Sequence, residues 1–262
     1  MEIDVELTHA TFTAIAVYSK MDQTGWFECS DENMNQLVRN SIWSLKSNFC
    51  DVPTDCPTRE RAAWTGDVGV FVETGLYFAD VYPVIRKWLT ECRLTQHDDG
   101  RLPNISPKNN RPNFYSGLLA GSVGWGDACI IVPFALYKRT GDIRILTENY
   151  AMMQKWYAFL EHRASQTSDN SIIEKSNPQA AYTIDTGIDY GEWCEPGVSV
   201  RETMSRPQIK VATAYFARSG QLLSEIAGIL GKPEDAAHYR EVAEKAAQAF
   251  HLVATDRKST RL

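Results

Sequence analysis

The residues most suited to chemistry lie in one stretch, residues 51–67, with the sequence DVPTDCPTRERAAWTGD. Its 17 residues include four carboxylates, two arginines, two prolines and a tryptophan. So many charges would be costly in a buried core unless they were paired. Two carboxylates beside a sugar ring are the minimal apparatus for glycoside hydrolysis, because one protonates the leaving oxygen while the other activates water or attacks. The candidates for this pair are Asp55, Glu60 and Asp67.

Glu60 stands between Arg59 and Arg61, and two positive neighbours stabilise a carboxylate and so oppose a role as an acid. For Glu60 to keep its proton, one arginine must turn toward another carboxylate. The structural alternative is that these arginines form an ion-pair network with Asp55 and Asp67 that only fixes a loop. The residue types of this stretch leave both interpretations open.

Tryptophans accompany each acidic cluster and offer flat apolar faces, which suit the C–H faces of a sugar and shield an acid from water. They are Trp64, Trp125 and Trp193. The same side chains would also serve a carbohydrate-binding protein without hydrolytic activity, and a helical interaction array is a third interpretation. Three other tryptophans fall on helical apolar stripes and are predicted to lie in the core, namely Trp43, Trp88 and Trp156.

The elements that must position these residues are predicted to be helices. Apolar residues at helical spacing predict seven of them, at about 31–48, 66–78, 82–92, 125–137, 142–160, 208–230 and 233–253. Prolines at 53 and 57 interrupt helical structure, so residues 51–67 are predicted to form a shaped loop that leads into a helix near Gly66. Residues 97–124 and 164–206 are predicted long loops, which are commonly functional. We therefore expect an all-α barrel or array with a functional face at one rim.

The two ends of the chain differ from its middle. Residues 5–18 are rich in threonine, valine and aromatic residues in partial alternation, which predicts a strand or two. A lone pair of strands is marginally stable, so residues 1–27 are interpreted as the tail of a preceding β-domain. Residues 254–262 carry no apolar stripe and are interpreted as a foreign or artefactual tail. The chain is accordingly expected to be a fragment cut at both ends.

Composition excludes several function classes. The net charge is −6 and no cluster of lysine and arginine stands out, so nucleic acid is not an expected partner. No run of 18 apolar residues occurs, so no membrane-spanning segment is expected. The six cysteines form no C-x-x-C pair and do not meet histidine at ligand spacing, which favours free thiols in a reducing compartment such as the cytoplasm over a metal site. The oligomeric state is left open.

The stretch 51–67 resembles the signature loop of bacterial α-L-rhamnosidases, glycoside hydrolase family 78. Four further motifs resemble this family: GWFECSD at 25–31, GWGDA at 124–128, YGEW at 190–193 and VATAYF at 211–216. The resemblance covers about residues 20–253. It implies an all-α fold, in which residues 28–253 form the N-terminal part of an (α/α)6 six-hairpin barrel, preceded by a short β segment from a missing β-sandwich domain.

The resemblance also implies a role for individual residues. Glu60 matches the general acid, and the other matches hold or line the sugar site: Asp55, Arg59, Trp64, Asp67, Trp125, Asp127, Glu192 and Trp193. The implied activity is an inverting hydrolysis that releases terminal α-L-rhamnose from glycosides or polysaccharides, without metal or cofactor. Inversion requires a second carboxylate as base. The resemblance implies a glutamate beyond Leu262, so the 262 residues alone are expected to be inactive.

Three departures from the family pattern bear on these expectations. Ala63 stands where glycine is common, which requires ordinary backbone angles there. Glu192 replaces the usual aspartate and makes that acid one methylene longer. Seven helices of twelve cannot close a barrel, so apolar surface is expected to be exposed. Another (α/α)6 glycosidase is the nearest alternative to a rhamnosidase.

Overall fold

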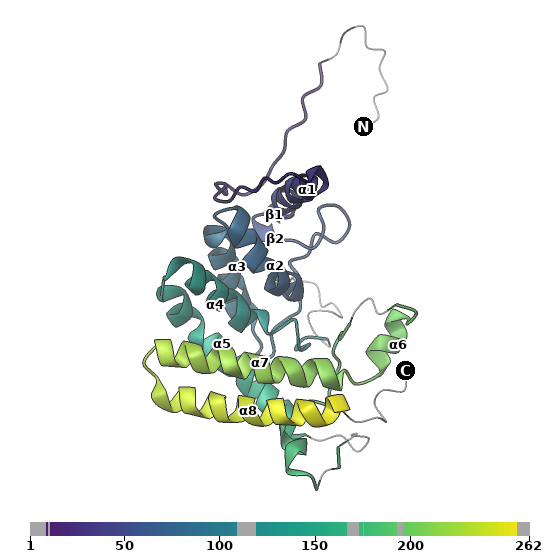
Figure 1. Cartoon of the computed structure of the whole chain (residues 1–262), viewed down its shortest axis with the longest axis vertical. Coiled ribbons are helices and arrows are strands. Elements are labelled where there is room, and N and C mark those ends of the chain that lie inside the picture. Colours follow the sequence, from purple (N-terminus) through teal and green to yellow (C-terminus); the bar gives the residue numbers. More distant parts are fainter. Residues whose placement is uncertain are drawn as a thin grey trace.

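The computed structural model describes residues 9, 11–108, 119–166, 173–174, 176–192 and 196–255. Trp193 and most of the predicted tail at 254–262 lie outside these ranges. The described chain is built mainly of helices (Figure 1). They are α1 (Glu32–Asn48), α2 (Thr65–Phe78), α3 (Tyr82–Thr95), α4 (Ala128–Thr140), α5 (Arg144–Ser165), α6 (Val200–Ser205), α7 (Ile209–Ile229) and α8 (Pro233–Thr255). None of the helices in these ranges is long and apolar enough to cross a membrane.

Consecutive helices form hairpins through short turns. Gly141 ends α4 in the left-handed conformation, with φ of 71°, and the chain returns as α5. Gly231 has φ of 70° and links α7 to α8, which begins at Pro233. A proline suits the first turn of a helix because the missing N–H has no partner there. Figure 1 shows α7 and α8 side by side and antiparallel, and the seven predicted helices are all present in the structure.

The core lies between these hairpins. Trp88 of α3 and Trp156 of α5 are fully buried, which confirms their predicted place. The prediction for Trp43 of α1 is wrong, because its side chain is 60% exposed. Helix α1 turns Leu45 toward the core, whereas the side chains of Met34, Leu37 and Trp43 are 44%, 55% and 60% exposed.

The remaining differences concern short elements. Residues 11–18 form no strand, because among the described residues this segment has no neighbouring strand with which to pair. Further along, Gln23 makes an isolated bridge to Ala79. The predicted loop 164–206 contains α6 and the 3₁₀ helix η1 (Pro178–Tyr182). Two two-residue strands, β1 (Phe49–Cys50) and β2 (Val52–Pro53), pair at the start of the loop 51–67.

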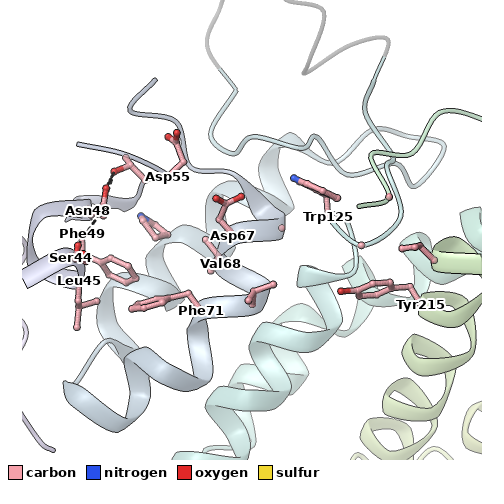
Figure 2. Close-up of a pocket in the computed structure, with 17 residues that line it drawn as sticks. Ser44, Leu45, Asn48, Phe49, Asp55, Asp67, Val68, Phe71, Trp125 and Tyr215 are labelled. Carbon is pink, nitrogen blue, oxygen red and sulfur yellow. Dashed lines mark hydrogen bonds between the residues drawn. The ribbon is translucent and has the colours of Figure 1, made fainter. Parts of the chain in front are cut away.

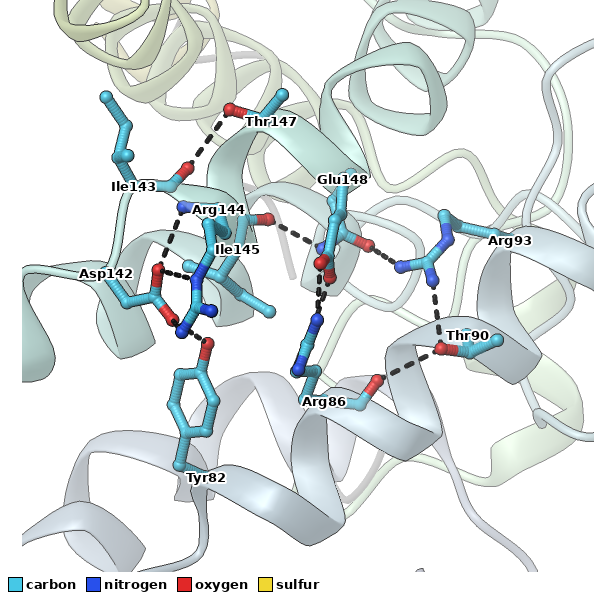
Figure 3. A network of polar contacts seen from close by, with 11 residues as sticks. Tyr82, Arg86, Thr90, Arg93, Asp142, Ile143, Arg144, Ile145, Thr147 and Glu148 are labelled. Atoms are coloured by element: carbon cyan, nitrogen blue, oxygen red, sulfur yellow. Dashed lines mark hydrogen bonds and ion pairs between the residues drawn. The ribbon is translucent and has the colours of Figure 1, made fainter.

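Polar contacts join α3 to α5 (Figure 3). The Tyr82 hydroxyl donates to Asp142 Oδ2 at 2.7 Å, and Arg86 Nε donates to Glu148 Oε2 at 3.1 Å. On its other side, α3 holds the loop 51–67, because Lys87 Nζ pairs with Asp51 Oδ2 at 2.9 Å. Helix α3 therefore connects the α4–α5 hairpin to the start of the loop 51–67, which carries the candidate catalytic residues.

Candidate active site

The loop 51–67 is closed by a pair of hydrogen bonds between Asp55 and Ala62. The Asp55 N–H donates to the Ala62 carbonyl, and the Ala62 N–H donates to Asp55 Oδ1, both at 3.0 Å. Within the described part of the chain, the non-glycine residues with positive φ are Asp51 and Arg61, at 70° and 53°. Ala63 follows with an ordinary φ, as expected from its replacement of glycine.

Glu60 is held at the mouth of this loop by three contacts. Its N–H donates to Cys56 Sγ at 3.1 Å, Oε1 accepts from Arg59 Nη2 at 2.8 Å, and Oε2 accepts from Trp64 Nε1 at 3.0 Å. The sequence argument required one arginine to turn toward another carboxylate, but Arg59 pairs with Glu60 itself. The Arg59 side chain is 82% exposed. An ion pair this exposed contributes little to stability and exchanges readily with other partners.

Six of the predicted site residues surround one cavity of about 640 Å³. They are Asp55, Arg59, Glu60, Trp64, Asp67 and Trp125. The volume lies within the range of small-molecule pockets. The lining combines three carboxylates, one arginine and two indole rings, which is the combination that a sugar requires: acceptors and donors for its hydroxyls and apolar faces for its C–H groups.

The electrostatics of this cavity are dominated by its negative charges. Asp67, in the first turn of α2, retains solvent access on one side. Loss of solvation on its other side nevertheless raises the pKa of its carboxyl, and the charges of Asp55 and Glu60 add to this effect. Its own backbone N–H partly opposes the shift. The raised pKa favours retention of a proton on Asp67.

A second cavity of about 620 Å³ adjoins the first and shares Asp55, Asp67 and Trp125 with it. Figure 2 shows these three residues along one side of the cavity. The remainder of its lining is largely apolar and includes Leu45 and Phe49 from α1 and β1, Val68 and Phe71 from α2, and Tyr215 from α7. Asp55 and Asp67 thus lie where a polar cavity meets an apolar one.

The aromatic side of the site is built by segments far apart in the sequence. Trp64 precedes α2 and forms an isolated bridge with Ile105. The Thr65 N–H donates to the Asn104 carbonyl at 2.8 Å, which holds this junction. Trp125 packs over Gly66, where a Cβ atom would lie 2.8 Å from the indole ring. Glycine at this position therefore permits the close approach of Trp125 to α2.

Two further predicted residues, Asp127 and Glu192, line neither cavity. Asp127 is fully buried and accepts hydrogen bonds from the Gly124 N–H at 2.7 Å, from Trp156 Nε1 at 3.1 Å and from Ser219 Oγ at 2.6 Å. Burial raises the pKa of Asp127, although these three donors oppose the shift. Asp127 thus anchors the turn that carries Trp125. Glu192 is exposed and lies outside both linings, and Trp193 lies outside the described residues.

Comparison with protein families identifies the domain. Residues 22–259 match the model of the bacterial alpha-L-rhamnosidase 6 hairpin glycosidase domain. The chain belongs to this family.

Characterised relatives within the family are much longer than this chain. An α-L-rhamnosidase of Formosa agariphila is 37% identical over 241 residues, which is 90% of this chain and 23% of the relative. The crystal structure of Streptomyces avermitilis α-L-rhamnosidase complexed with L-rhamnose superposes with a TM-score of 0.72 at 32% identity, covering 90% of this chain and 20% of that one. For α-L-rhamnosidase from Dictyoglumus thermophilum the TM-score is 0.75 at 31% identity, covering 90% and 24%. The chain therefore spans about a fifth to a quarter of the length of these relatives.

The sequence argument missed four residues of the cavity lining, namely Cys56, Ala62, Ile105 and Tyr190. Cys56 and Ala62 lie inside the signature loop, and Tyr190 is the first residue of the YGEW motif, so their positions carried a signal. The sequence around Ile105 gave no such signal, because Ile105 reaches the site through its bridge with Trp64. Among the described residues, no three histidine, cysteine, aspartate or glutamate side chains gather as metal ligands.

Proposed function

We propose that this domain is part of an inverting α-L-rhamnosidase, which hydrolyses terminal α-L-rhamnosyl bonds in glycosides or polysaccharides. The observation that supports the proposal most strongly is the gathering of Glu60, Asp55 and Asp67 around one cavity that Trp64 and Trp125 also line. The domain belongs to a family whose relatives are named for this activity. Because those relatives are four to five times longer, the activity is assigned to the full-length protein rather than to residues 1–262.

In this proposal Glu60 supplies the proton. Its carboxyl donates to the glycosidic oxygen while the bond from that oxygen to the anomeric carbon breaks, and the aglycone leaves as an alcohol. The Trp64 indole N–H holds Oε2 at 3.0 Å, which leaves Oε1 to face the substrate once Arg59 moves to a sugar hydroxyl. Because Arg59 is exposed, this exchange of partners has a small free-energy cost.

Asp55, Arg59 and Asp67 bind the sugar hydroxyls, and Trp64 and Trp125 pack against its apolar faces. The raised pKa of Asp67 suits this role, because a protonated carboxyl donates one hydrogen bond and accepts others.

Inversion requires a water molecule on the opposite face of the sugar, activated by a second carboxylate roughly 6.5–9.5 Å from the acid. This water attacks the anomeric carbon and loses a proton to the base. We assign the base to a glutamate beyond Leu262, as the family resemblance implies, and the acidic side chains of the cavity to proton donation and hydroxyl binding.

The proposal is tested by assaying the full-length protein against a panel of nitrophenyl glycosides. We expect kcat/KM for the α-L-rhamnoside to exceed that for the α-L-fucoside, α-D-mannoside and β-D-glucoside by at least about a hundredfold, since a misplaced hydroxyl leaves buried polar groups unpaired. A preference for another sugar would show that the domain serves a different glycosidase.

The stereochemistry is tested separately by proton NMR of the first-formed product. Inversion of an α-L-rhamnoside releases β-L-rhamnose, which then mutarotates. Initial appearance of the α-anomer would contradict the inverting mechanism, because retention requires a covalent intermediate and a shorter distance between the carboxylates.

A further inference from the structure

Tyr190 is almost fully buried, but it lies at the centre of the candidate site. Only 2% of its surface is exposed, yet its ring centroid lies 4.5 Å from that of Trp125 and 6.0 Å from that of Trp64. The contact with Trp64 is edge-to-face, with an interplanar angle of 76°. Both distances fall in the range in which aromatic pairs attract one another. Tyr190 is therefore wedged between the two indoles that form the apolar side of the cavity.

The Tyr190 ring is itself held by buried polar groups. Its hydroxyl accepts a hydrogen bond from Asn104 Nδ2 at 3.2 Å, and its N–H donates to Ser122 Oγ at 3.2 Å. Asn104 is fully buried, and its carbonyl accepts the N–H of Thr65, the residue next to Trp64. One asparagine thus links the backbone beside Trp64 to the far end of the Tyr190 side chain.

The residue before Tyr190 anchors this segment more firmly. Asp189 accepts two hydrogen bonds from Arg163 of α5, at 3.1 and 2.9 Å, and a third from the Val123 N–H at 2.7 Å. The Arg163 and Asp189 side chains are 8% and 4% exposed. A bidentate pair of this kind is strong and geometrically specific. Arg163 therefore fixes the backbone from which Tyr190 projects.

From Tyr190 the contacts continue to the proposed acid. The Trp64 indole, against which Tyr190 packs, donates its N–H to Glu60 Oε2 at 3.0 Å. An indole ring can rotate about two side-chain torsions, and Trp64 is half-buried, so its orientation depends on the surfaces that it touches. Without the Tyr190 ring, Trp64 would lose this aromatic contact.

We infer that Tyr190 is a positioning residue for catalysis: it orients the Trp64 indole, and through the indole N–H it orients the carboxyl of Glu60. The inference rests on the proposed function, in which Glu60 is the acid. Tyr190 acts through its ring rather than through its hydroxyl, because the ring makes both indole contacts, whereas the hydroxyl faces Asn104. Its small exposed fraction leaves the direct sugar contacts to Trp64 and Trp125.

The kinetic test compares Tyr190→Leu with Tyr190→Phe in the full-length protein. A displaced acid misaligns the proton transfer, and misplacement of about 1 Å costs up to about a hundredfold in rate. We expect Tyr190→Leu to lower kcat at least about tenfold while KM changes less than about threefold, and Tyr190→Phe to recover most of the lost kcat. Tyr77→Leu, at a side chain of α2 that is 69% exposed and outside both cavities, is the matched control and should retain wild-type kinetics.

A second readout is independent of activity. Oxidative footprinting with mass spectrometry measures the accessibility of each tryptophan in the full-length protein. In Tyr190→Leu we expect oxidation of Trp64 to rise several-fold, whereas Trp88, which is fully buried in α3, stays protected. If the wild-type protein hydrolyses no rhamnoside, the proposed function fails, but the footprint still shows whether Tyr190 orients Trp64.

Each outcome decides the inference. The inference would be overturned if oxidation of Trp64 is unchanged in Tyr190→Leu. It would also be overturned if Tyr190→Leu changes KM and leaves kcat unchanged, because Tyr190 would then only line the pocket. If Trp88 becomes accessible in Tyr190→Leu, the comparison is repeated with Tyr190→Met, which fills more of the ring volume. Exposure of Trp88 in both variants would also overturn the inference, since Tyr190 would then be required for the fold rather than for the orientation of Glu60.

Discussion

The packing of Gly66 against Trp125 makes the site sensitive to a single methyl group. In Gly66→Ala the new Cβ would lie 2.8 Å from the indole, so Trp125 must move. Overpacking of this kind costs about 1–3 kcal/mol, and we expect kcat/KM for the rhamnoside to fall roughly tenfold or more. Steady-state kinetics of the full-length variant measure the effect.

Gly69→Ala is the control for this prediction, because Gly69 lies one turn further along α2. Its nearest neighbour would be the Ala128 Cβ at 3.6 Å, an ordinary contact. Replacing glycine by alanine within a helix stabilises by about 0.5–1 kcal/mol where the space exists. Gly69→Ala should therefore keep wild-type kinetics with a slightly raised melting temperature, and equal losses in both variants would refute a specific effect on Trp125.

Asp127 distinguishes a buried anchor from a sugar ligand. An asparagine in its place has one acceptor oxygen for three donors, so at least one of Gly124, Trp156 and Ser219 loses its acceptor. We expect Asp127→Asn to destabilise the fold by about 1–3 kcal/mol in denaturant unfolding. If stability were unchanged while rhamnose affinity fell, Asp127 would instead contact the substrate, as the family resemblance alone implied.

At the scale of elements, the contact between α3 and α5 should depend on pH. Asp142 accepts hydrogen bonds from Arg144 and from the Tyr82 hydroxyl (Figure 3), and these hold the pKa of its carboxyl below the usual value of 3.8. A carboxyl whose pKa is lowered in the folded state stabilises that state above the unfolded pKa, and this contribution disappears as the pH falls through the folded pKa.

We therefore expect Asp142→Asn to lower the melting temperature at neutral pH, with a difference from wild type that shrinks below about pH 4. Melting curves recorded at several pH values between about 7 and 3 measure this trend. A difference that grew toward acid pH would contradict the assignment, because it would require a raised pKa for Asp142.

Helix periodicity predicted the long elements well and the short ones poorly. Helices such as α5 and α7 have enough turns for an apolar stripe to be recognised, and their bounds differ from prediction by a few residues. Helix α6 has six residues, and β1 and β2 have two each, too few for a period. The predicted strand at 5–18 is absent from its described part, residues 11–18, because strand formation depends on a partner that local sequence cannot supply.

The site was predictable only as far as it is local. Six of the predicted site residues, which belong to two motifs, line one cavity. The contact of Tyr190 with Trp64 joins residues far apart in the chain, and no local pattern reports such a pairing. Asp127 shows the converse limit: its motif was recognised, but only the fold shows that its carboxylate accepts hydrogen bonds from Trp156 and Ser219 and does not line the cavity.

At the scale of the whole molecule, the exposed apolar side chains of α1 should govern association. Met34, Leu37 and Trp43 are 44%, 55% and 60% exposed. Exposed apolar side chains favour association when a partner surface covers them. We expect residues 1–262, expressed alone, to self-associate in sedimentation velocity, and the double variant Leu37→Ser with Trp43→Ser to shift the population toward monomer.

Leu94→Ser is the control, since Leu94 is 75% exposed and lies on α3 rather than on α1. It should leave association unchanged. In the full-length protein, the double variant should lower the melting temperature if other segments cover α1. If the double variant still self-associates, the surface that drives association does not lie on α1.

The central claim is that Glu60 donates the proton, and the dependence of rate on the leaving group tests it most directly. A nitrophenolate departs with little assistance, whereas an alkyl aglycone requires a proton, so Glu60→Gln should harm the alkyl rhamnoside far more. We expect kcat/KM of the full-length variant to fall roughly 10²–10⁴-fold on the alkyl rhamnoside and clearly less on the nitrophenyl rhamnoside. Glu244→Gln, an exposed position on α8, should match wild type on both. An alkyl-rhamnoside rate within about tenfold of wild type in Glu60→Gln would show that Glu60 is not the acid.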